Sequence, residues 1–143
     1  MKIHLGVIEQ KYANSKESVG TGDVAEILED HYGILQTFVN WNIKDIAKDM
    51  ASSLAGSLET MMMGGPHGDP FAAAMDKTQT RAKKFISSQE AERRIISGRW
   101  PVPTGAALKG INHRKKNPRT GIRRPSFIDT GLYQNSLKAW VEE

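Results

Sequence analysis

The sequence predicts a helix-rich α+β fold, because two periodic patterns and one irregular segment share its 143 residues. At the N-terminus, Ile3, Leu5 and Val7 alternate with more polar neighbours, as in a strand with one buried face. Most of the remaining chain carries apolar residues at steps of three and four, which indicates long amphipathic helices. Residues 99–125 are instead basic and rich in proline and glycine, so we expect an extended segment within one domain, 1–143.

The first two helices are separated by a glycine. Residues 12–22 are rich in Ser, Gly, Asn and Thr and predict a loop, after which a helix begins near Asp23. Gly33 is placed to end or kink that helix. The strongest pattern follows it and predicts a helix of about 40 Å, at roughly 1.5 Å rise per residue. Its apolar positions are Leu35, Val39, Ile43, Ile46, Met50, Leu54, Leu58 and Met61.

Two further helices are expected. Asp69 predicts an N-cap and Pro70 the first helical position of a helix that runs to about Arg94. A short helix after Asp129 or Thr130 is predicted to end the basic segment, with four apolar residues on one face, Tyr133, Leu137, Trp140 and Val141.

The N-terminal strand needs a partner, because one strand alone is not stable. The sequence offers few other strand candidates, so we expect a small sheet completed by the basic segment or by a neighbouring subunit. The methionines at 61–63 indicate either the end of the long helix, which we favour, or an adaptable partner-binding surface.

Composition restricts the class of protein. The chain is 38% apolar and 25% charged, has no apolar run of about 18 residues, and begins without the continuous apolar region of a signal peptide. We therefore expect neither export nor a membrane partner. The absence of cysteine excludes disulfides, thiolate nucleophiles and sulfur-ligated zinc.

Charge is distributed unevenly. Residues 93–128 hold ten Lys and Arg and no Asp or Glu, whereas the remaining chain holds ten basic and 16 acidic residues. A cationic segment attached to an acidic body indicates a partner, either nucleic acid or an acidic protein surface. Our candidate contacts are Arg99, Arg114, Lys115, Lys116, Arg119, Arg123 and Arg124.

No pattern of catalytic residues stands out. Phe-Ile-Asp-Thr-Gly at 127–131 has the form of an aspartic-protease loop, but that chemistry needs a second carboxylate and several strands after the loop. Helix capping by Asp129 or Thr130 is the simpler interpretation. His4, His31, His67 and His113 lack metal-ligand spacing, and no phosphate-binding glycine loop is present. We expect no enzyme activity, no cofactor and no metal.

Two segments resemble the neck, tail-completion or virion-morphogenesis proteins of tailed bacteriophages. The first is Arg-Trp-Pro-Val-Pro-Thr-Gly-Ala-Ala-Leu-Lys-Gly at 99–110, and the second is Arg-Pro-Ser-Phe-Ile-Asp-Thr-Gly-Leu-Tyr-Gln-Asn-Ser-Leu-Lys-Ala-Trp at 124–140. The first matches the family's Trp-Pro segment with a following Thr and Lys, and the second its Thr-Gly-x-Leu-x-x-Ser element. The matching residues are Trp100, Pro101, Thr104, Lys109, Thr130, Gly131, Leu132 or Tyr133, Ser136 and Leu137.

The resemblance implies a structural virion protein, made in the host cytoplasm and located at the head–tail junction. It implies a homo-oligomeric ring, six-fold or twelve-fold, that meets other neck, portal-adaptor and tail-terminator proteins and could contact packaged DNA. The residues expected to shape the C-terminal motif are Trp100, Asp129, Thr130, Gly131, Tyr133, Ser136, Leu137 and Trp140. The alternative is a small nucleic-acid-binding module whose arginines contact phosphates without reading bases.

Overall fold

The computed structural model describes residues 1–12, 19–66, 68–96, 99–111, 119–128 and 131–142. It confirms the helix-rich α+β class with an N-terminal strand. In chain order the elements are β1 (Lys2–Val7), α1 (Thr21–Tyr32), α2 (Ile34–Met62), α3 (Ala72–Ser87), α4 (Glu90–Arg94), α5 (Gly105–Leu108), α6 (Leu132–Ser136) and β2 (Leu137–Glu142). Within these ranges, no helix is both long and apolar enough to span a bilayer.

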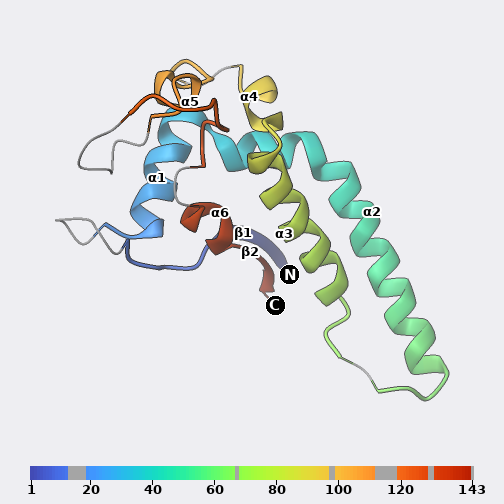
Figure 1. Cartoon of the computed structure of the whole chain (residues 1–143). Helices are drawn as coiled ribbons and strands as arrows, with labels where there is room; N and C mark the ends of the chain where they lie inside the picture. The colour runs from blue at the N-terminus through green and yellow to red at the C-terminus, as the bar shows by residue number, and fades with distance from the viewer. Residues whose placement is uncertain (13–18, 67, 97–98, 112–118, 129–130, 143) are drawn as a thin grey trace.

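The long helix α2 forms a hairpin with α3 and lies along one side of the molecule (Figure 1). The sheet packs on α3, while α1 and α4 contact α2. The main core lies between these groups, where Phe38 of α2 meets Phe85 of α3 with ring centroids 5.6 Å apart. The hairpin therefore supplies both a wall of the core and an outer surface.

The strand β1 pairs with β2 in an antiparallel ladder that runs from Lys2 opposite Glu142 to Val7 opposite Leu137. The partner strand is therefore the chain's own C-terminus, and the expectation that the basic segment or a neighbouring subunit supplies it is wrong. The predicted final helix is also wrong beyond Ser136, where α6 ends. From Leu137 onwards apolar and polar residues alternate, and the backbone groups of β1 bind them as a strand.

Gly33 ends α1, as predicted. Its φ of 60° places it in the left-handed region, and its backbone N–H donates to the Glu29 carbonyl at 2.8 Å. The Glu29 carboxylate then accepts from the backbone N–H groups of Leu35 at 2.7 Å and Gln36 at 2.9 Å. One glycine and one glutamate thus join the end of α1 to the start of α2.

The predicted helix from Pro70 to Arg94 is two helices. The Asp69 carboxylate accepts from the Phe71 N–H at 2.9 Å, but α3 begins at Ala72 with Phe71 as its N-cap. The prediction of Asp69 as the N-cap and Pro70 as the first helical position is therefore wrong, because the turn that Asp69 closes lies before the helix. Gln89 has a φ of 61°, and this left-handed residue separates α3 from α4. The spacing of apolar residues continues across this break, so the sequence pattern did not predict two separate helices.

Candidate assembly surfaces

The described part of the C-terminal element, residues 131–137, is largely buried. Gly131, with a φ of 79°, precedes α6, and its carbonyl accepts from the Asn135 N–H at 2.9 Å. Tyr133, Ser136 and Leu137 are each 4% exposed or less. Burial raises the pKa of the Tyr133 hydroxyl, which therefore stays neutral. These described residues build the core, while Asp129 and Thr130 lie outside the described residues.

Trp140 lies on the other face of the sheet. Its indole stacks on the imidazole of His4 at 5.3 Å, and His4 Nε2 lies 2.8 Å from the Glu142 carboxylate. A Cβ at Gly6 would stand 3.2 Å from the indole, so the absence of a side chain there lets Trp140 lie across the strand. The sheet thus has a buried face toward α3 and an aromatic outer face.

The basic segment begins on the end of α1. The backbone N–H of Arg99 donates to the His31 carbonyl at 2.7 Å, and the Trp100 ring meets the His31 ring edge-on at 5.6 Å. Both side chains still face outward, because Trp100 is 55% exposed and the Arg99 side chain 72%. The guanidinium of Arg99 lies 3.7 Å from the Asp30 carboxylate, an exposed pair that adds little stability.

The end of the basic segment is held by Glu92 of α4. One carboxylate oxygen accepts from the backbone N–H of Ser126 at 2.8 Å and from its hydroxyl at 2.6 Å. The other accepts from Arg123 at 2.9 Å. The Glu92 side chain is only 5% exposed, so these three hydrogen bonds replace those that its carboxylate would form with water. Sequence reasoning missed this residue, because nothing in the local pattern links Glu92 to Ser126, 34 residues away.

The candidate basic residues differ in what they contact. Arg124 is partly buried, and its guanidinium donates to the backbone carbonyls of Ile111 and Ile128, so it holds the segment in shape. Arg119 is exposed and forms no ion pair with the residues that the structure describes. Arg114, Lys115 and Lys116 lie outside the described residues. Of the candidates described, Arg99, Arg119 and Arg123 therefore present charge at the surface.

Apolar side chains accompany these charges. Ile96 is 87% exposed and Ile122 is 93% exposed, next to Arg123 in the sequence. A solvated basic loop has no need for such residues, whereas apolar groups mixed with Arg and Trp are typical of protein interfaces. We use the name basic–apolar surface for six exposed residues in and just before the basic segment: Ile96, Arg99, Trp100, Arg119, Ile122 and Arg123.

Replacing Glu92 with glutamine is expected to lower the free energy of unfolding by about 2 kcal/mol at neutral pH, because a charge-assisted hydrogen bond is lost. Burial by itself raises the pKa of Glu92, but the hydrogen bonds from Ser126 and Arg123 outweigh it and hold the pKa below its ordinary value of 4.5. The stabilisation is therefore complete above that value and is lost as pH falls through the lower pKa of the folded protein. Urea unfolding of both proteins across this range measures the difference.

The matched control is Glu90→Gln. Glu90 lies on the same short helix and pairs with Arg94 at 3.4 Å, but its side chain is 47% exposed. This change is expected to cost less than about 0.5 kcal/mol. An equal loss in the two variants, or a Glu92→Gln difference that persists in acid, would contradict the anchoring role of Glu92.

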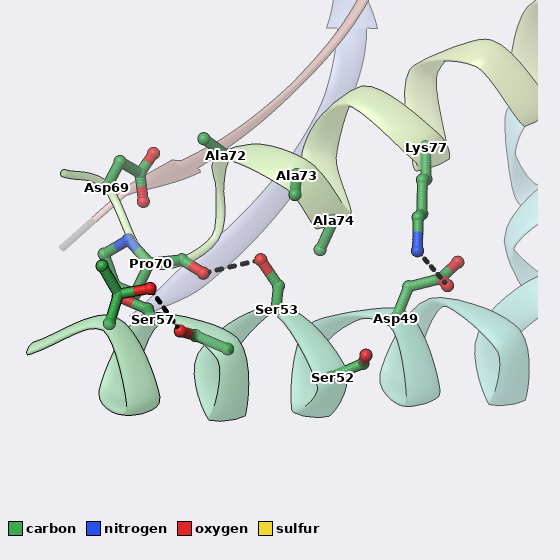
Figure 2. Close-up of a pocket in the computed structure, with 12 residues that line it drawn as sticks. Asp49, Ser52, Ser53, Ser57, Asp69, Pro70, Ala72, Ala73, Ala74 and Lys77 are labelled. Carbon is green, nitrogen blue, oxygen red and sulfur yellow. Dashed lines mark hydrogen bonds and ion pairs between the residues drawn. The ribbon is translucent and has the colours of Figure 1, made fainter. Parts of the chain in front are cut away.

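A polar groove of about 440 Å³ separates α2 from the beginning of α3 (Figure 2). Small side chains line it, and the Ser53 hydroxyl donates across it to the Pro70 carbonyl at 2.7 Å. The partly buried carboxylate of Asp49 lies 2.7 Å from Arg81 and 3.6 Å from Lys77. The hydrogen bond from Arg81 lowers the pKa of Asp49, so this group is an ion-paired carboxylate that ties α2 to α3.

Comparisons with known proteins add no family to this description. No family model, curated protein or solved structure matches the chain. In the described residues, no three His, Asp or Glu side chains gather as they would around a metal ion. The functional argument therefore rests on the surfaces described above.

Proposed function

We propose that this chain is a structural protein of the neck of a tailed bacteriophage, where it joins the capsid portal complex to the tail by ring assembly. The observation that carries the proposal is the basic–apolar surface, because Arg, Trp and Ile side chains in and beside one segment of the chain are exposed. Arg and Trp are enriched among the residues that dominate protein interfaces. The sequence resemblance of segments 99–110 and 124–140 supplies the particular assembly.

The described part of the C-terminal element supports a scaffolding role. Tyr133, Ser136 and Leu137 are packed in the core, and Ser136 donates its hydroxyl to the Tyr133 carbonyl at 2.8 Å. Side chains packed in this way stabilise the fold and are not available to contact a partner, so a partner would bind exposed residues instead. The element would thus fix the chain just after the basic segment, so that the segment starts and ends at the folded body.

The uneven charge supports contact between unlike surfaces. In a head-to-tail ring each copy places one surface against a different surface of its neighbour. The basic segment of one subunit would lie against the acidic body of the next, or against an acidic rim of a portal-adaptor or tail-terminator protein. Six-fold and twelve-fold rings both satisfy this arrangement.

A small nucleic-acid-binding module is the second candidate. Exposed Arg99 and Arg119 favour it, since guanidinium groups bind phosphates, and Trp100 offers a ring for base stacking. Arg123 and Arg124, however, are engaged by Glu92 and by backbone carbonyls. We favour a protein surface as the partner, because the exposed Ile96 and Ile122 offer apolar contacts that a phosphate backbone does not use.

The test is a phage whose gene for this chain is interrupted. We expect heads and tails that remain unjoined in negative-stain microscopy, and normal particles when the wild-type chain is supplied. An antibody against the chain should label the head–tail junction. Normally joined particles without the chain, or label elsewhere, would overturn the assignment.

A charge variant then tests the surface itself. Arg99→Glu combined with Arg119→Glu is expected to reduce joining about tenfold or more, since like charges would meet at the interface. The matched control is Lys84→Glu with Lys138→Glu, which makes the same charge change at exposed sites on α3 and β2. Equal loss in both variants would show that net charge alone matters. Salt-dependent DNA binding lost only in the first variant would favour the nucleic-acid module.

A further inference from the structure

The outer side of α2 carries a row of apolar residues that the fold leaves uncovered. Ile43 is 52% exposed, Leu54 40%, Leu58 51% and Met61 49%. With the exposed Ala47 they follow one another at steps of four, seven, four and three residues, which places all five on one side of the helix. We call this row the α2 stripe. Because α2 forms an outer edge of the molecule, a partner can approach it (Figure 1).

The stripe differs from the buried side of the same helix. Ile46 is 5% exposed and packs in the core, and Asp49 is tied to Arg81 of α3. Beyond that side, a second row of apolar side chains leaves about half of its surface uncovered. Covering apolar surface contributes about 25 cal/mol per Å², and an uncovered row of this length is typical of a binding surface.

The charges beside the stripe indicate which partner covers it. Lys44, Lys48, Ala55 and Glu59 also follow one another at steps of four and seven, so they form one flank of the stripe. The flank is basic toward the beginning of α2 and acidic toward its end. In an antiparallel pair of identical helices the same flank of each copy meets its counterpart. Lys44 and Glu59 are equally far from the midpoint between Ala51 and Ser52, so each lysine would face a glutamate.

The two ends of the apolar row have a centre half a residue away, at Ser52. Ile43 and Met61 are equally far from Ser52, so the two ends of the stripe would meet in the antiparallel arrangement. Ala47, Ala51 and Ala55 are exposed small residues that permit two helix axes to approach to about 8–10 Å. In a parallel pair the two charged flanks would lie on opposite sides of the contact, and the Lys44–Glu59 match would be lost.

We propose that two copies of this chain associate through their α2 stripes, antiparallel, about a two-fold axis near residues 51 and 52. The contact is isologous, since the same surface is used by both copies. It goes beyond the neck assignment and uses a different surface from the basic–apolar one. The dimer is a property of the purified chain, whereas the neck assignment is tested in particles, so either can fail without the other.

The chain has no cysteine, so single introduced thiols can report the pairing. One sample carries Lys44→Cys and another Glu59→Cys, and the two are mixed and oxidised. Antiparallel pairing is expected to give the mixed disulfide about tenfold faster than either homodisulfide. The control thiol is Ser88→Cys, at an exposed site after α3, which should cross-link slowly with itself and with both samples. Homodisulfides of Lys44→Cys as the main product, or equal rates at all sites, would overturn the proposal.

Light scattering on the wild-type chain gives an independent reading. We expect twice the chain mass at tens of micromolar, and the single-chain mass for Leu54→Glu with Leu58→Glu. Both replaced side chains are exposed, so circular dichroism should show that the variant remains folded. A wild-type monomer at that concentration, or an oligomer unchanged by the two substitutions, would contradict the role of the stripe.

Discussion

Replacing Phe38 with alanine is expected to lower the free energy of unfolding by about 3–5 kcal/mol, which corresponds to a fall of roughly 10 °C or more in the melting temperature. The Phe38 side chain is 1% exposed and meets the Phe85 ring edge-on, with 64° between the ring planes. Removing it leaves a cavity between α2 and α3 and abolishes the aromatic contact. Thermal unfolding followed by circular dichroism measures the loss.

Trp41→Ala is the control on the same helix. This substitution removes an even larger side chain than Phe38→Ala does. Trp41, however, is 57% exposed, and the Arg94 guanidinium lies 3.9 Å from the centre of its ring. A cation–π contact at such a site is worth about 0.5–1 kcal/mol. If the tryptophan variant lost as much stability as the phenylalanine variant, the orientation of α2 in the fold would be wrong.

The helices α1 and α2 were predictable because their signals are local. Gly33 marks the end of α1 through its own backbone conformation, and apolar spacing alone delimits α2. Periodicity could not show which apolar residues are buried. Ile43 and Ile46 belong to the same predicted face, yet Ile46 is 5% exposed and Ile43 is 52% exposed. The difference depends on where α3 and the sheet lie, and the spacing of apolar residues in α2 does not predict those positions.

The candidate site was predictable in part. Arg99 and Arg119 are at the surface, in keeping with the charge pattern, whereas Arg124 is engaged by backbone carbonyls of its own segment. Whether an arginine faces a partner or a carbonyl depends on the path of the loop around it. That path is fixed by Glu92, through contacts that span 34 residues to Ser126. The basic residues of this surface could therefore be predicted from the charge pattern. The path of the segment that carries them could not, because it depends on long-range contacts.

The C-terminal residues show how two patterns can compete. Tyr133, Leu137 and Trp140 fit one face of a helix, but Leu137 and Ala139 also alternate with Lys138 and Trp140 as in a strand. The six residues of β1 favour the strand. If residues 137–142 formed a helix, the backbone groups of β1 would lack hydrogen-bond partners, whereas a strand at 137–142 supplies them. The deciding partner lies at the opposite end of the sequence.

Leu137→Asp is expected to abolish folding, or to cost about 3–5 kcal/mol or more, because it places an unpaired charge where the side chain is 1% exposed. Lys138→Asp, one residue away on the exposed side of β2, should cost less than about 1 kcal/mol. Urea unfolding monitored by circular dichroism compares the two. A similar cost for both would contradict the alternation of the strand.

The substitution Trp140→Ala distinguishes the observed strand from the helix that the sequence alone predicts. In that helix Trp140 shares the buried face of Leu137, so its removal would cost about as much as a core aromatic, 3–5 kcal/mol. In the strand it lies on the outer face, 41% exposed, and loses mainly the stacking on His4. We therefore expect a loss of about 1 kcal/mol. A small effect at Trp140 beside a severe one at Leu137 is the result expected when the two side chains lie on opposite faces, as they do when β2 pairs with β1.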